Sequence, residues 1–181
     1  MKKITNPVKM KNKMMAAAIM LAGFVTNANA QSTAYGTTTA VLVTPISIAK
    51  TTDMHFGTVA SSATAGTVVL DYADGRTQTG GASLPTGSTL QKTGVFTVTG
   101  ETTSGFAITI PSAPITLTGS VSGTMTVSGF LCDAGAATTL VAGSKILKVK
   151  ATLNVPANTV AGTYTHNALD LTGLFVTVNY N

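Results

Sequence analysis

The side chains that most often carry chemistry are few in this sequence and form no known catalytic pattern. The only cysteine is Cys132, and the only histidines are His55 and His166. A cysteine nucleophile needs a base and a third group that orients the base, and neither histidine lies in a motif of that kind. The sequence also lacks G-x-S-x-G, H-E-x-x-H and phosphate-loop motifs. We therefore expect no catalytic residues and no enzymatic activity.

The segment Asp71–Arg76 (DYADGR) is the best candidate for a metal site. A calcium loop needs more oxygen ligands at closer alternate spacing, whereas the pair Asp74-Gly75 is a strong turn signal. The pattern favours a turn, with a metal site as the weaker alternative. A single cysteine leaves no internal disulfide, and we interpret Cys132 as a small buried hydrophobe. We expect no metal and no cofactor.

The formal net charge of +5 arises at the start of the chain. Five lysines precede an apolar run at 14–25, and Ala28 and Ala30 follow it in an A-x-A pattern. This arrangement is typical of a secretory signal peptide over residues 1–30, and the run is too short for a transmembrane helix. From Gln31 onward six basic residues balance six acidic ones. The balance gives no support for nucleic-acid binding, and we expect no transmembrane segment after cleavage.

The elements that follow the signal sequence are predicted to be strands. The chain from Gln31 is rich in Thr, Gly, Val and Ala, which favours short β-strands separated by turns. Turns every eight to twelve residues favour an antiparallel sandwich or barrel. We predict strands at 41–48, 67–72, 94–99, 106–110, 115–118, 124–130, 145–155 and 174–180, with a loop at 77–89. Pro45 indicates an edge strand or a bend in the first of these.

Several ordered segments resemble a known family. They are Met54–Val59, Gly66–Val69, Phe96–Glu101, Phe106–Pro111, Ala151–Val155, Ala161–Tyr164 and Val176–Asn181. In this order they resemble the secreted bacterial domain-of-unknown-function family 4402. The A-G-x-Y segment and the alternating last strand with Tyr180 are also similar to fimbrial subunits of the chaperone–usher type and to spore-coat U proteins. The resemblance implies an immunoglobulin-like, pilin-like antiparallel β-sandwich that a donated strand completes.

The resemblance also implies how subunits would assemble. In such pilins the sandwich lacks its last strand, a periplasmic chaperone fills the gap, and the N-terminal extension of the next subunit then replaces the chaperone. Strand addition gains main-chain hydrogen bonds, and alternate side chains fill pockets. The resemblance implies a signal peptide at 1–30, a donor extension at 31–43 and a sandwich domain at 44–181. The implied acceptor groove and last strand contain Gly162, Tyr164, Leu174, Val176, Val178 and Tyr180.

The register of the donor extension has two solutions. One set of alternating residues is Ala34, Gly36, Thr38, Ala40 and Leu42, which we predict to face the groove. The shifted set, with Thr39, Val41 and Val43, also alternates, and a slip of one residue reverses every side chain. Tyr180 likewise has two interpretations, as an assembly residue or as an aromatic that closes the core.

The expected function is that of a structural, pilin-like subunit of a bacterial surface fibre with a role in adhesion or biofilm formation. The partners implied by the resemblance are copies of the chain or related subunits, a periplasmic chaperone and an outer-membrane usher. The implied route is export through the inner membrane, transit through the periplasm, and deposition at the cell surface. The alternative is a self-complete secreted β-sandwich that binds a glycan or an envelope protein, for instance through loop 77–89.

Overall fold

The computed structural model describes residues 31–87, 89–166 and 173–181. The predicted signal peptide, residues 1–30, lies outside the described residues, as do residues 167–172 between His166 and Gly173. The chain divides into two units, Met1–Val41 and Leu42–Asn181. Within the first unit, residues 31–41 form no regular secondary structure, and their side chains are exposed.

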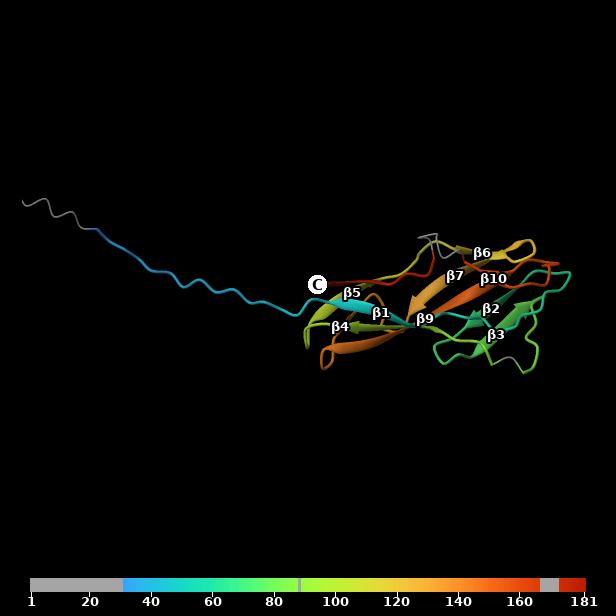
Figure 1. Ribbon diagram of the computed structural model, residues 1–181, viewed down its shortest axis with the longest axis horizontal. Coiled ribbons are helices and arrows are strands. Elements are labelled where there is room, and N and C mark those ends of the chain that lie inside the picture. The colour runs from blue at the N-terminus through green and yellow to red at the C-terminus, as the bar shows by residue number, and fades with distance from the viewer. Residues whose placement is uncertain (1–30, 88, 167–172) are drawn as a thin grey trace, which may run out of the picture. The chain divides into compact units, whose positions relative to one another are not determined.

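The second unit consists of antiparallel strands in two sheets (Figure 1). The larger sheet has the order β1 (Ser47–Thr52), β4 (Gly94–Thr99), β9 (Ser144–Val155), β7 (Thr124–Cys132), β6 (Ile115–Gly119) and β10 (Tyr164–Thr165). The strand β2 (Gly66–Leu70) also pairs with β9, and β3 (Arg76–Gly80) pairs with β2. The smaller sheet has the order β11 (Thr177–Tyr180), β5 (Gly105–Thr109) and β8 (Ala137–Thr139). The described residues form no helix, so the predicted all-β, sandwich-like fold is confirmed.

Strict alternation along the strands builds the core. In β9, Leu147, Val149 and the apolar residues that follow at every second position are buried, while Lys148 and its alternates face outward. The same period applies in β4, where Phe96 and Val98 are buried. Side chains at successive strand positions point to opposite faces. One face of the larger sheet therefore supplies the core, and the other carries mostly polar residues, with Val69, Leu131 and Ile146 exposed among them.

The outer face of the larger sheet is stabilised by hydroxyl pairs between neighbouring strands. Thr67 and Thr79 lie opposite each other in β2 and β3, and their hydroxyl oxygens are 2.6 Å apart. The hydroxyls of Thr51 and Thr97 lie 3.0 Å apart in β1 and β4. Cross-strand threonine pairs contribute to sheet stability, so these threonines add to the stability that the buried core provides.

Some predicted boundaries are wrong. The first strand begins at Ser47, after Pro45, and not at Val41, because proline lacks the backbone donor that a paired strand requires. The predicted loop 77–89 begins inside β3, a polar strand with largely exposed side chains. The last strand spans only Thr177–Tyr180. Within the described residues, no helix is long and apolar enough to cross a membrane.

Candidate functional site

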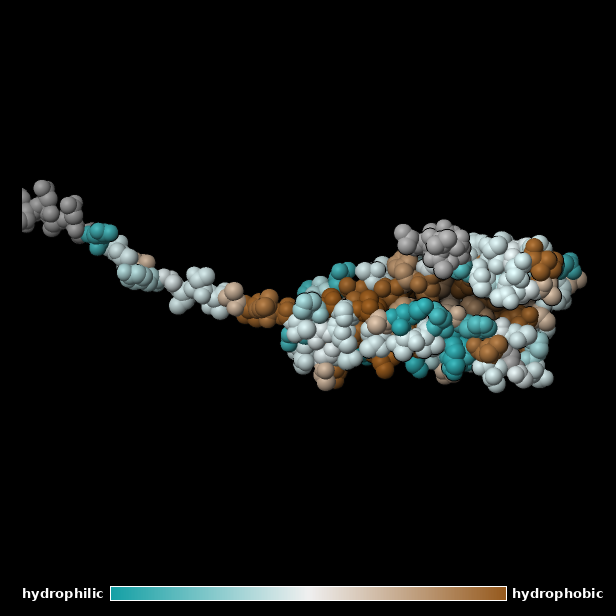
Figure 2. Space-filling view, viewed as in Figure 1, coloured by the Kyte–Doolittle hydropathy of each residue, from teal (hydrophilic) through white to brown (hydrophobic). Residues whose placement is uncertain are grey.

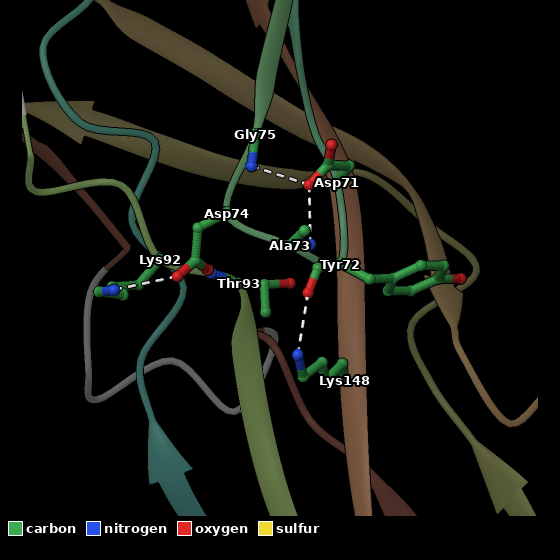
Figure 3. Close-up of polar contacts among 8 residues, drawn as sticks. All are labelled: Asp71, Tyr72, Ala73, Asp74, Gly75, Lys92, Thr93 and Lys148. Atoms are coloured by element: carbon green, nitrogen blue, oxygen red, sulfur yellow. Dashed lines mark hydrogen bonds and ion pairs between the residues drawn. The ribbon is translucent and has the colours of Figure 1, made fainter.

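The segment Asp71–Arg76 forms a turn that the side chain of Asp71 closes against the backbone (Figure 3). The carboxylate of Asp71 accepts hydrogen bonds from the backbone N–H groups of Ala73 at 2.8 Å and Gly75 at 2.7 Å. Asp74 adopts a φ of 65°, a left-handed conformation that aspartate tolerates better than most residues. The predicted turn is confirmed, and the Asp71 carboxylate serves to close it.

The second carboxylate of this turn joins it to the two residues that precede β4. Asp74 accepts hydrogen bonds from the backbone N–H of Thr93 at 2.7 Å and from Lys92 Nζ at 2.9 Å (Figure 3). The hydrogen bond from Thr93, followed by that from Lys92, lowers the pKa of Asp74. Thr93 is buried, and its hydroxyl donates to Val149 O at 2.7 Å. The turn therefore has a structural role.

The other chemically capable side chains also have structural surroundings. His55 Nδ1 accepts a hydrogen bond from the backbone N–H of Gly57 at 2.8 Å. Cys132 is buried, as predicted, and burial raises the pKa of its thiol. No group of three or more histidine, cysteine, aspartate or glutamate side chains that could hold a metal ion occurs among the described residues.

The last strand offers one free backbone edge. Among the described residues, β11 pairs only with β5. Asn181 N–H donates to Gly105 O at 3.2 Å. In an antiparallel pair every second residue directs its backbone groups toward the partner strand, so Thr177 and Asn179 do so toward β5. The backbone groups of Val178 and Tyr180 therefore point away from β5, toward the open side of the strand. Such an edge is a template for pairing with another chain.

The inner face of the last strand packs along the inner face of β4. Val176 and Val178 are buried. A Cβ atom at Gly94, the first residue of β4, would lie 3.1 Å from Leu174 and 3.7 Å from Met54. At the other end, Gly100 lies directly beneath the hydroxyl of Tyr180. The predicted alternation of Leu174, Val176, Val178 and Tyr180 toward one side is thus confirmed.

Apolar side chains remain partly exposed beside this open edge. We define the apolar band by the partly buried residues that border β1 and the last strand: Ile46, Ile48, Met54, Leu174 and Tyr180. Residues of β1 and β11 also contact each other. Figure 2 shows hydrophobic surface running across this face of the second unit. An exposed apolar strip next to unpaired backbone groups is suited to receive a strand with apolar residues at alternate positions.

Two predicted acceptor residues, Gly162 and Tyr164, lie away from the last strand, just before and within β10. Tyr164 belongs to β10, which pairs with β6 in the larger sheet. The Tyr164 hydroxyl donates to Val160 O at 2.7 Å, and Ser122 O lies 3.0 Å from the same hydroxyl oxygen. A Cβ atom at Gly162 would lie 3.0 Å from the Ser120 hydroxyl. The structure therefore divides the predicted set, with Leu174 to Tyr180 at the open edge and this pair beside β6.

A cluster that the sequence did not reveal lies where the chain enters the second unit. The hydroxyl of Tyr180 donates to Thr44 O at 2.7 Å and accepts from the backbone N–H of Glu101 at 2.6 Å. The backbone N–H of Thr44 donates to the Glu101 carboxylate at 3.0 Å, and this hydrogen bond lowers the pKa of Glu101. These residues lie far apart in the sequence, so only the fold brings them together. We call Thr44, Glu101 and Tyr180 the exit clamp.

The predicted donor residues lie before this clamp. Ala34, Gly36, Thr38, Ala40 and Leu42 are exposed, and they form no strand. Leu42 is 99% exposed, Val41 84% and Val43 46%. Both alternating sets therefore remain available for pairing, and the choice between them stays a prediction.

Together, the antiparallel sheets define a sandwich-like β domain with one open edge at β11. The family model described as "Domain of unknown function (DUF4402)" matches residues 46–180, and the chain belongs to this family. No curated protein and no solved structure shows a significant match to the chain.

Proposed function

We propose that this protein is a structural, pilin-like subunit of a bacterial surface fibre, assembled by donor-strand complementation between copies or related subunits. The observation that carries the proposal is the open edge of β11, where Val178 and Tyr180 direct unpaired backbone groups beside the apolar band. The exposed residues 31–43 supply an alternating segment of suitable length for that edge. In this proposal Ala34, Gly36, Thr38, Ala40 and Leu42 face the band.

The cellular route belongs to the same proposal. The predicted signal peptide directs export through the inner membrane. A periplasmic chaperone then covers the open edge, because an uncovered edge promotes aggregation. An outer-membrane usher receives the subunit, and the fibre serves adhesion or biofilm formation at the cell surface.

The decisive experiment places a charge on each alternating set of the donor segment. In the chain beginning at Gln31, Leu42→Asp alters one set and Val41→Asp alters the other. Burial of a leucine side chain contributes about 1.5–3 kcal/mol, and an unpaired carboxylate in an apolar site is costly. We expect Leu42→Asp to abolish polymers in sedimentation velocity and negative-stain microscopy, while Val41→Asp leaves them intact.

The remaining outcomes distinguish the alternatives. The reverse pattern would assign the shifted register and retain donor-strand assembly. Normal polymers from both variants would contradict the proposal. A wild-type chain that stays monomeric at every concentration would favour the self-complete sandwich that binds a glycan or an envelope protein. Circular dichroism of both variants shows whether the β domain remains folded.

A further inference from the structure

In donor-strand assembly, residues 31–43 of each copy could bind either to the open edge of β11 in a second copy or to the same edge in their own chain. Residues 31–43 directly precede β1, and β1 borders the apolar band. A tethered segment has an effective concentration in the millimolar range, far above that of a second copy in dilute solution. Insertion into the segment's own edge would therefore compete strongly with assembly unless the chain opposes it.

Self-insertion requires a chain reversal immediately before β1. Two consecutive segments can lie side by side only if a turn joins them, and the available positions are Val43, Thr44 and Pro45. A turn with Pro45 at its second position is compatible with proline, but it would need Thr44 O as its closing acceptor. A turn centred on Thr44 is disfavoured, because the residue before a proline avoids the helical region that the central residues of common turns use. Thr44 is therefore restricted toward extended conformations by its own sequence context.

The exit clamp holds the same residue on both sides of its backbone. Thr44 N–H donates to Glu101 at 3.0 Å, and Thr44 O accepts from the Tyr180 hydroxyl at 2.7 Å. The clamp thus pins the only polar backbone groups that Thr44 could use in a turn. A reversal here would have to break both hydrogen bonds and also overcome the restriction that Pro45 imposes.

We propose that the exit clamp, together with Pro45, prevents residues 31–43 from entering their own open edge and so directs them to a second copy of the chain. This inference rests on the proposed function. Tyr180 acts in it as a positioning residue, because its hydroxyl holds the base of the donor segment, while its ring belongs to the apolar band that receives a strand.

The test compares Tyr180→Phe, Pro45→Gly and the double variant with wild type, all beginning at Gln31. Tyr72→Phe is the matched control, because the Tyr72 hydroxyl forms no hydrogen bond in the described structure. Assembly is measured by sedimentation velocity, and amide hydrogen exchange of residues 34–43 is measured in the dilute monomer. Pro45→Gly leaves the core untouched and keeps the test usable if Tyr180→Phe fails to fold.

We expect rapid exchange of residues 34–43 in monomers of wild type and of Tyr72→Phe. In the double variant we expect the equilibrium to shift about tenfold toward self-insertion, the effect of losing one to two net hydrogen bonds. The segment should therefore exchange more slowly than in wild type, and less polymer should form. If the double variant forms polymers and exchanges as wild type does, this inference is wrong while the proposed function stands. A wild-type chain that never assembles would overturn the proposed function, and this inference with it.

Discussion

The hydrogen bond between Asp74 and Thr93, the residue that precedes β4, allows a quantitative prediction about stability. Asp74→Asn keeps the size of the side chain and suits the φ of 65° at this position. It removes the charge that strengthens the bond from Thr93 N–H. Charge-assisted hydrogen bonds are roughly twice as strong as neutral ones, so we expect a loss of about 1 kcal/mol from this bond.

The ion pair with Lys92 contributes a smaller amount. The Lys92 side chain is 56% exposed and that of Asp74 is 32% exposed, so screening by solvent limits the pair to about 0–1 kcal/mol. The total expected destabilisation is about 1–2 kcal/mol. Asp53→Asn is the matched control, because Asp53 also pairs with a lysine, Lys50, but is 79% exposed. That control should change the free energy of unfolding by less than about 0.5 kcal/mol.

The pH dependence provides an independent check. The pKa of Asp74 is lowered in the folded state, so its stabilising effect is present above the unfolded pKa of about 3.9 and is lost as the pH falls through the folded value. Urea unfolding followed by circular dichroism should show the full difference between wild type and Asp74→Asn at neutral pH, and little difference well below pH 4. Equal effects of the two variants, or a difference that persists in acid, would refute this reasoning.

Two further predictions concern the buried thiol and the glycine beneath the exit clamp. Burial raises the pKa of Cys132, so a thiol reagent at pH 8 should react far more slowly with native protein than with urea-unfolded protein; similar rates would show that the thiol is accessible. Gly100→Ala would place a Cβ against the Tyr180 hydroxyl and 3.0 Å from Leu140, so urea unfolding should reveal a loss of about 1–3 kcal/mol, and an unchanged midpoint would contradict the geometry.

The strands that can be predicted best from the sequence are those in which apolar and polar residues alternate. The boundaries of β4 and the buried face of β9 followed directly from that period. The strand β3 was missed because its residues are polar and mostly exposed, and only pairing with β2 defines it. Strand propensity also predicts a first strand that begins at Val41. In the structure this strand begins at Ser47, because Pro45 lacks the backbone donor that a paired strand requires.

Sequence reasoning reached the candidate site only in part. The shared face of Leu174, Val176, Val178 and Tyr180 is a local property of one strand and was predictable. The exit clamp joins positions as distant as Thr44 and Tyr180, and no local pattern encodes such a contact. The separation of Tyr164 from the last strand likewise depends on sheet order, which the sequence period does not specify.

Amide hydrogen exchange along β11 tests the central claim most directly. In the monomer, the amides of Thr177 and Asn179 should be protected by β5, while those of Val178 and Tyr180 should exchange freely at the open edge. In assembled material, we predict that the second pair becomes protected by more than about tenfold while the first pair stays protected. Free exchange of Val178 and Tyr180 in the assembled state would contradict strand addition at this edge.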